Sequence, residues 1–146
     1  SGKAHREFTD FVEIVRPLLR AEREELYIRT FDMNPVATLD LGWHLYAEDY
    51  NRGLFLAKLR GLLRRYEVPE THELPDHASH VLRLLARMPA EEAADLAHAC
   101  VLPALKKCLE GIRRGNPYRL LLQTVLDVLE TAFAELHEEA GNGICV

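Results

Sequence analysis

The chain of 146 residues lacks most features on which catalysis, nucleic-acid binding or membrane insertion usually depends. It contains no glycine-rich phosphate loop, no HExxH motif and no GxSxG motif. Its formal net charge is -5, whereas a nucleic-acid-binding protein normally carries a basic excess. No apolar run approaches the roughly 20 residues of a membrane-spanning helix, and no signal peptide is visible. We therefore do not expect catalysis of the kinds that these motifs support, a nucleic-acid partner or insertion into a membrane.

Cysteine is scarce, and its placement excludes a disulfide scaffold. The three residues, Cys100, Cys108 and Cys145, are odd in number and form no CxxC pair. Cys100 and Cys108 fit the apolar stripe of a helix. The pattern predicts reduced thiols in a cytosolic protein, in positions that give little support to nucleophilic catalysis.

Hydrophobic residues recur at spacings of three and four along almost the whole chain, and turn signals are few. The pattern predicts an all-α fold: one compact helical bundle of six to seven helices, forming a single domain over residues 1–146. Ser1-Gly2 resembles a tag-cleavage remnant, and residues 141–146 are expected to form a loose C-terminus. We expect helices over about 4–16, 18–30, 38–47, 48–66, 75–88, 89–112 with a bend at Pro103, and from Pro117 to Gly141.

Histidines and carboxylates gather near the middle of the chain, where five such residues fall within nine positions: His72, Glu73, Asp76, His77 and His80. His77 and His80 are three apart on an expected helix, so both could face one ion. The spacing, however, matches none of the usual zinc forms. Residue chemistry alone favours a helix start at which Asp76 complements the helix dipole and a histidine packs locally. A metal-binding bundle that uses His72, His77 and His80 remains the alternative.

Aromatic residues crowd the first third of the chain, at Tyr27, Phe31, Trp43, Tyr46 and Tyr50. In a bundle of this size, large aromatic side chains belong mostly to the core. The alternative is an apolar groove that receives a partner segment, because Tyr and Trp offer an apolar body with a polar tip.

Several segments, taken in order, resemble one protein family. They are LYIRTFD at 26–32, GWHLY at 42–46, DYNRG at 49–53, ELPDH at 73–77 and NPY at 116–118. Over about residues 20–130 the chain resembles the NarJ branch of the NarJ/TorD/DmsD chaperones, which mature molybdenum oxidoreductases. Each signature alone is weak, but their order and distances together are specific.

The resemblance implies an all-helical fold and a protein that is not an enzyme and binds no cofactor stably. It implies a cytoplasmic chaperone, monomeric or dimeric, for an apo molybdoenzyme catalytic subunit such as a nitrate reductase-like oxidoreductase. The chaperone binds the N-terminal segment of this client, which is a signal or a remnant of one. The client receives the molybdopterin cofactor before assembly or twin-arginine export.

The same resemblance implies where the client binds. The family's Pro-Asp-His motif is associated with client recognition, and its other signatures map to Tyr27 and Phe31 and to Arg52. A groove edged by acidic residues, with Asp76 pairing a basic side chain, would suit a basic and apolar client segment. The expected client-binding residues are Pro75, Asp76, His77, Glu73, Tyr27, Phe31, Asp32, Trp43, Tyr46 and Arg52.

The GWHLY segment at 42–46 departs from the pattern typical of nitrate reductase chaperones, which leaves the identity of the molybdoenzyme client open. A generic helical interaction module is a second alternative, and it predicts that Asp76 and His77 can be replaced by alanine without loss of partner binding. The chaperone hypothesis predicts weaker client binding with little loss of stability, because removing a helix-start residue costs only about 0.5–2 kcal/mol.

Overall fold

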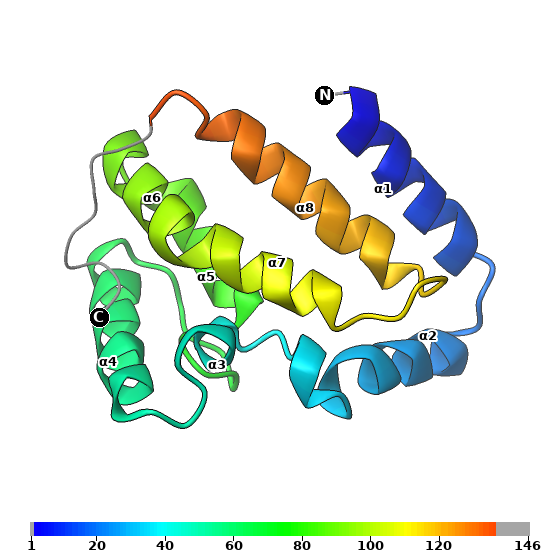
Figure 1. Ribbon diagram of the computed structural model, residues 1–146, viewed down its shortest axis with the longest axis horizontal. Coiled ribbons are helices and arrows are strands. Elements are labelled where there is room, and N and C mark those ends of the chain that lie inside the picture. The colour runs from blue at the N-terminus through cyan, green and yellow to red at the C-terminus, as the bar shows by residue number, and fades with distance from the viewer. Residues whose placement is uncertain (1, 137–146) are drawn as a thin grey trace. The chain divides into compact units, whose positions relative to one another are not determined.

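A computed structural model describes residues 2–136, and it is all-α as predicted (Figure 1). The one extended pairing in this range is an isolated antiparallel bridge between Asp40 and His77. The α-helices are α1 (Gly2–Val15), α2 (Arg20–Tyr27), α3 (Leu41–Tyr46), α4 (Tyr50–Arg65), α5 (Ala78–Arg87), α6 (Ala90–Leu96), α7 (Leu102–Glu110) and α8 (Tyr118–Ala132).

Two helix starts follow directly from capping residues that the sequence displays. The side chain of Asp49 accepts a hydrogen bond from the backbone N–H of Asn51 and so caps α4. Asn116 caps α8, because its Oδ1 accepts a hydrogen bond from the N–H of Tyr118 at 2.9 Å. Pro117 stands between the cap and that donor, where its missing N–H costs nothing. Both predicted starts are confirmed.

Four predicted helix boundaries are wrong. The helix expected to run from Pro117 to Gly141 ends at Ala132. The helix expected to open at Pro75 begins at Ala78, with His77 as its N-cap. The helix expected to end at Thr30 changes at Ile28–Asp32 into a π-helical turn, η1. The helix expected over 38–47 is shortened to α3, because the backbone of residues 39–41 bonds to the turn that carries Asp76.

The helix with Pro103 does not stop there. A π-helical turn, η3 (Ala97–Val101), joins α6 to α7, and its flanking residues keep helical backbone angles. Proline has no N–H and its ring crowds the preceding turn, and a π-turn just before it is one way of relieving both. Counting α6 to α7 as one rod gives seven helical rods in the range described.

The contacts of the chain group into two units. Of the described residues, one unit comprises 2–38 and 105–132, and the other comprises 39–104 and 133–136. The boundary falls inside α7. The expected single domain therefore stays a prediction, and the two units are described separately.

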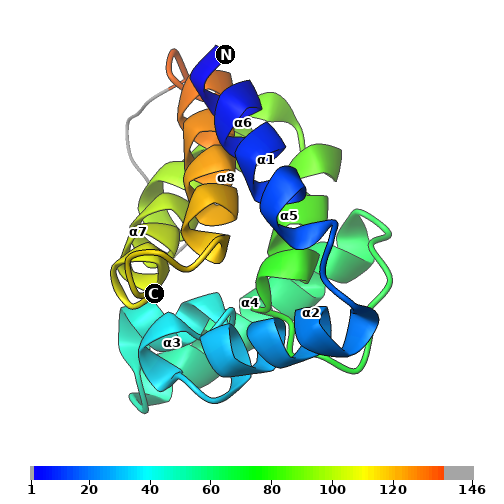
Figure 2. The same cartoon turned by 90° about the vertical axis from the view of Figure 1, so that its right-hand side faces the viewer.

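In the first unit, α1 packs along α8, as Figures 1 and 2 show from two directions. The aromatic side chains meet at Tyr118, whose ring centroid lies 5.3 Å from that of Phe11 and 4.9 Å from that of Phe31. Tyr27 contacts both Phe31 and Tyr118. Phe31 is 3 % exposed, so the core interpretation is confirmed for this residue.

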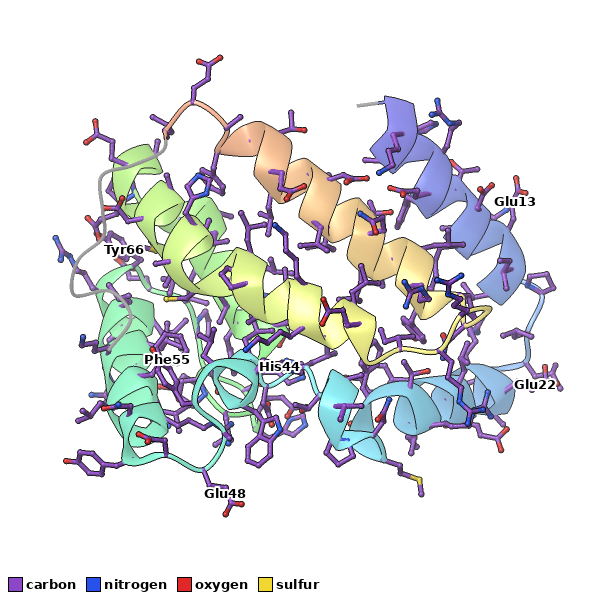
Figure 3. The ribbon with its side chains drawn as sticks, viewed as in Figure 1. Glu13, Glu22, His44, Glu48, Phe55 and Tyr66 are labelled. Carbon is purple, nitrogen blue, oxygen red and sulfur yellow. The ribbon has the colours of Figure 1, made fainter. Side chains whose placement is uncertain are left out.

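In the second unit, α4 packs against α3 and α5, and α5 packs against α6. Phe55, on the side of α4 that faces α3 in Figure 3, is buried with its ring centroid 5.5 Å from that of Tyr46. Tyr50 lies at the other extreme, with 79 % of its surface exposed. The core of this unit is formed by buried apolar side chains of these helices and of the segments that follow them: Leu59, Leu63, Val81, Leu84, Leu85, Met88, Leu96 and Val101.

The prediction of buried, reduced cysteines is confirmed only in part. Cys108 is a free, fully buried thiol whose Sγ donates a hydrogen bond to the carbonyl of Ala37, and burial raises its pKa to about 12. Cys100 is buried as predicted but is disulfide-bonded, so the expectation of reduced thiols is wrong at this position. Cys145, Gly141 and the expected C-terminal tail lie outside the described residues.

Candidate binding site around Asp76

Asp76 is the centre of a polar network inside the second unit. Its side chain is fully buried, and Oδ2 accepts hydrogen bonds from the backbone N–H of Gly42 at 2.9 Å and from Arg52 Nη2 at 3.1 Å. Arg52 Nε donates to the same oxygen at 3.2 Å. A carboxylate held by a guanidinium fork and a backbone N–H is charge-assisted at each contact. The network links the starts of α3 and α4 to the turn before α5.

The backbone reinforces the same junction. The N–H of Leu41 donates to the carbonyl of Asp76 at 2.9 Å, and the N–H of Ala78 donates to the carbonyl of Leu39 at 2.8 Å. Gly42 has no room for a side chain, because a Cβ there would meet Oδ2 of Asp76 and the ring of Phe55. The close approach of the carboxylate therefore requires glycine at this position.

Burial raises the pKa of Asp76 above its ordinary value, and the carboxylate of Asp40 acts in the same direction. Arg52 and the N–H of Gly42 lower it, but they do not outweigh the loss of solvent. The ion pair thus holds a charge that the protein interior disfavours, which makes the network sensitive to the loss of either partner.

A second group of polar side chains lies beside this network at the surface. Ligand atoms of Asp40, Glu73 and His77 all lie within 4.8 Å of one another, and we call these three residues the acidic cluster. The side chains of Asp40 and Glu73 are 31 % and 39 % exposed. Arg52 connects the two groups, because its Nη2 lies 4.0 Å from Oδ2 of Asp40.

The hydrogen bonds of His77 fix the role of its ring. Nδ1 accepts the backbone N–H of Ser79 at 3.1 Å, so the neutral ring carries its proton on Nε2. Nε2 lies 3.8 Å from Oε2 of Glu73. A metal ligand would need its lone pair on Nε2, and the other nitrogen of a ligating histidine normally donates. The acidic cluster is therefore poorly suited to a metal and well suited to hydrogen bonding.

The alternative metal set is not assembled either. His80 is fully buried, with Nε2 accepting the N–H of Thr71 at 2.9 Å and Nδ1 facing the carbonyl of Leu74 at 2.8 Å. Its two nitrogens therefore have structural partners. His72 is 89 % exposed and pairs with Glu73. His72, His77 and His80 do not converge within the described part of the chain.

The predicted client-binding residues are divided between the two units. Tyr27, Phe31 and Asp32 belong to the first unit, and Phe31 is buried there while Asp32 is exposed. The others belong to the second unit: Trp43, Tyr46, Arg52, Glu73, Pro75, Asp76 and His77. The assignment of these ten residues to client binding stays a prediction.

Within the second unit the structure changes which residues of the 73–77 segment can contact a client directly. Pro75 and Asp76 are fully buried, and the basic partner of Asp76 is Arg52 of the chain itself. Glu73 is the member of the motif that reaches the surface, whereas the side chain of His77 is only 12 % exposed. The sequence alone did not identify Asp40 as part of the site, nor the close approach of Asp76 that requires glycine at residue 42. The glycine that opens the GWHLY segment was the one feature of the sequence that could have indicated this contact.

The fold and the site define an all-α protein whose central polar network holds three helix starts together and places carboxylates at the surface beside it. The chain belongs to the nitrate reductase delta subunit family, whose model matches residues 1–114. Among curated proteins and among solved structures, no significant match to the chain was found. Family membership implies a non-enzymatic maturation chaperone for a molybdoenzyme. It also implies binding to a nitrate reductase catalytic subunit. In the described part of the chain, no helix is both long and apolar enough to span a bilayer.

Proposed function

We propose that this protein binds the N-terminal segment, a signal or its remnant, of an apo molybdoenzyme catalytic subunit in the cytoplasm. The client is a nitrate reductase-like oxidoreductase or a relative of it. Binding keeps the client competent until the molybdenum cofactor is inserted, before assembly or export. The chaperone forms no covalent bond to the client and keeps no cofactor of its own.

The observation that carries this proposal is the acidic cluster. Two partly exposed carboxylates, Asp40 and Glu73, lie close enough for one guanidinium or ammonium group to contact both. Basic side chains in a client N-terminus have the complementary charge. The exposed aliphatic side chain of Leu74, next to Glu73, offers an apolar contact.

The buried Asp76 has a positioning role in this proposal. By holding Arg52 and the N–H of Gly42, it fixes the turn that presents Glu73 and His77. It acts on the client through these neighbours and not by direct contact. Replacing it is therefore expected to weaken binding and stability together.

The experiment is calorimetric titration of the full chain with synthetic N-terminal peptides of the molybdoenzyme catalytic subunits from the same organism. We expect one peptide to bind. Glu73→Gln should lower the affinity for this peptide about two- to fivefold, which is the usual contribution of an exposed ion pair. Glu91→Gln, at the exposed start of α6, removes the same charge elsewhere in the same unit and should leave binding unchanged. Failure of every peptide to bind the folded protein would contradict the proposal.

A further inference from the structure

The first unit contains a cavity of about 560 Å³ that the proposed function does not use. One wall is formed by residues from the segment 29–36, and the other by residues from the segment 111–116 that links α7 to α8. The volume lies within the range of about 300–1,000 Å³ typical of ligand pockets.

Direct contacts hold the two walls together. The side-chain amide of Asn34 donates a hydrogen bond to the carbonyl of Gly111 at 3.0 Å. A Cβ on Gly111 would meet the carbonyl of Val36, so this approach also requires glycine. At the other end, Asn116 Nδ2 donates to Thr30 Oγ1 at 2.8 Å. The cavity is therefore already formed in the free protein.

The charge of the cavity is positive. Arg29 and Arg113 both line it, both are exposed, and neither forms an ion pair or side-chain hydrogen bond within the described part of the chain. No carboxylate lines the cavity. Asn116, at its edge, caps the N-terminus of α8, and a helix N-terminus adds a partial positive charge. This surface attracts an anion and repels the basic segment proposed for the acidic cluster.

Apolar side chains accompany the arginines. Met33 and Val36 line the cavity with 76 % and 62 % of their surface exposed, while Ile112 is buried beneath. Arginine and methionine are both enriched at protein interfaces, and exposed methionine adapts to varied apolar partners. A small inorganic anion would use the arginines alone and leave this apolar surface in water.

We propose that the cavity binds an acidic segment of a partner protein, in which a carboxylate side chain stands beside an apolar one. Arg29 and Arg113 hold the carboxylate, and Met33 and Val36 cover the apolar side chain. The occupant differs from the client segment proposed above, because its charge is opposite.

The test uses the full chain and the peptide acetyl-Leu-Glu-Glu-Leu-Phe-amide, with acetyl-Leu-Gln-Gln-Leu-Phe-amide as its neutral match. We expect the acidic peptide to bind more tightly, and Arg113→Gln or Arg29→Gln to weaken it about fivefold each. Arg114→Gln is the matched control, since Arg114 is exposed but does not line the cavity. Its effect should be negligible.

Methionine oxidation locates the peptide independently. Of the two methionines, Met33 is 76 % exposed at the cavity and Met88 is 6 % exposed in the core, so Met88 serves as an internal reference. The acidic peptide should slow peroxide oxidation of Met33 and not that of Met88. The proposal would be overturned if the two peptides bound equally well, or if Arg113→Gln and Arg114→Gln had equal effects on binding. It would also be overturned if inorganic phosphate bound more tightly than the acidic peptide and displaced it without protecting Met33 from oxidation.

Discussion

The carboxylate of Asp76 occupies the space in which a side chain at residue 42 would begin, and it accepts the N–H of Gly42 at 2.9 Å. The two residues are 34 positions apart in the sequence. Their contact joins the GWHLY and ELPDH segments into one structural unit. This contact gives a structural reason for the glycine of the one segment and the aspartate of the other.

Replacing Asp76 by alanine should destabilise the protein by about 3 kcal/mol, because Arg52 and the N–H of Gly42 would lose a buried partner. This corrects the expectation of little loss of stability that the sequence alone suggested. Urea unfolding of the two proteins measures the difference. A loss below about 0.5 kcal/mol, the level of an ordinary surface substitution, would contradict the buried network.

Gly42→Ala should also destabilise the chain, because its Cβ would meet the Asp76 carboxylate. In the Asp76→Ala background this clash is removed, so the cost of Gly42→Ala should be smaller there. The double-mutant cycle therefore has a coupling free energy of about 0.5–3 kcal/mol. Additive effects would show that the two residues do not share the space.

His77 combines two roles that one pair of variants can separate. As the N-cap of α5 it accepts the N–H of Ser79, and its Nε2 faces Glu73. His77→Ala should cost about 1 kcal/mol of stability, whereas His77→Asn retains a capping side chain and should cost less. If the ring recognises the client, both variants should bind the peptide more weakly in calorimetry. Normal binding by His77→Asn would limit His77 to capping.

Gly53 follows Arg52 in the predicted motif, but the fold does not require it. It lies within α4, and a Cβ there would meet nothing within 4 Å; the same is true of Gly61. Each change to alanine should raise stability by about 0.5–1 kcal/mol. Should Gly53 allow close approach of a client, Gly53→Ala would weaken peptide binding and Gly61→Ala would not. Equal binding by both variants would exclude that role.

Two carboxyl groups in the first unit predict a pH dependence. Oε1 of Glu7 and Oδ2 of Asp127 are buried and have no hydrogen-bond partner among the described residues, although Nζ of the exposed Lys3 lies 3.4 Å from that Oδ2. Burial and the neighbouring Asp127 carboxyl raise the pKa of Glu7 above its ordinary value of 4.5, whereas the Glu7 carboxyl, which can donate when protonated, lowers the pKa of Asp127 below 3.8. One shared proton satisfies both groups.

The stability that protonated Glu7 contributes is present below pH 4.5 and is lost as the pH rises through its higher folded pKa. Asp127 acts oppositely, losing its contribution as the pH falls below 3.8. Glu7→Gln keeps a donor toward Asp127, so its stability relative to the native chain should increase as the pH rises above 4.5. Thermal unfolding between pH 4 and 8 measures this, with exposed Glu13→Gln as the control. A constant difference would rule out the shared proton.

The sequence was sufficient for features set by local chemistry. Periodicity predicted the helices, and Asp49 and Asn116 marked two helix starts because capping depends on neighbours two positions away. It was misleading at Asp76, where proline and aspartate before a histidine suggest an exposed helix start. The burial of Asp76 depends on Gly42 and Arg52, which no local pattern connects to it.

The resemblance to the family rested on short motifs, and the family is confirmed by the match over residues 1–114. The roles of individual motif residues needed coordinates. Asp40, which has no motif of its own, joins the site only because the backbone pairs it with His77. The π-turn before Pro103 likewise depends on how a continuous helix accommodates a residue that the sequence marks as an interruption.

The most direct measurement is a charge exchange between the protein and the client peptide that binds in calorimetry. Glu73→Lys should weaken the binding of the native peptide. Replacing the peptide's contacting arginine by glutamate should likewise weaken its binding to the native chain. Combining the two changes should restore a substantial part of the affinity, because the charges are again complementary. Restored binding would place the client's basic segment on the acidic cluster. If the two losses of affinity simply added in the combined pair, the client's basic segment would not contact Glu73, and the proposed binding site would be wrong.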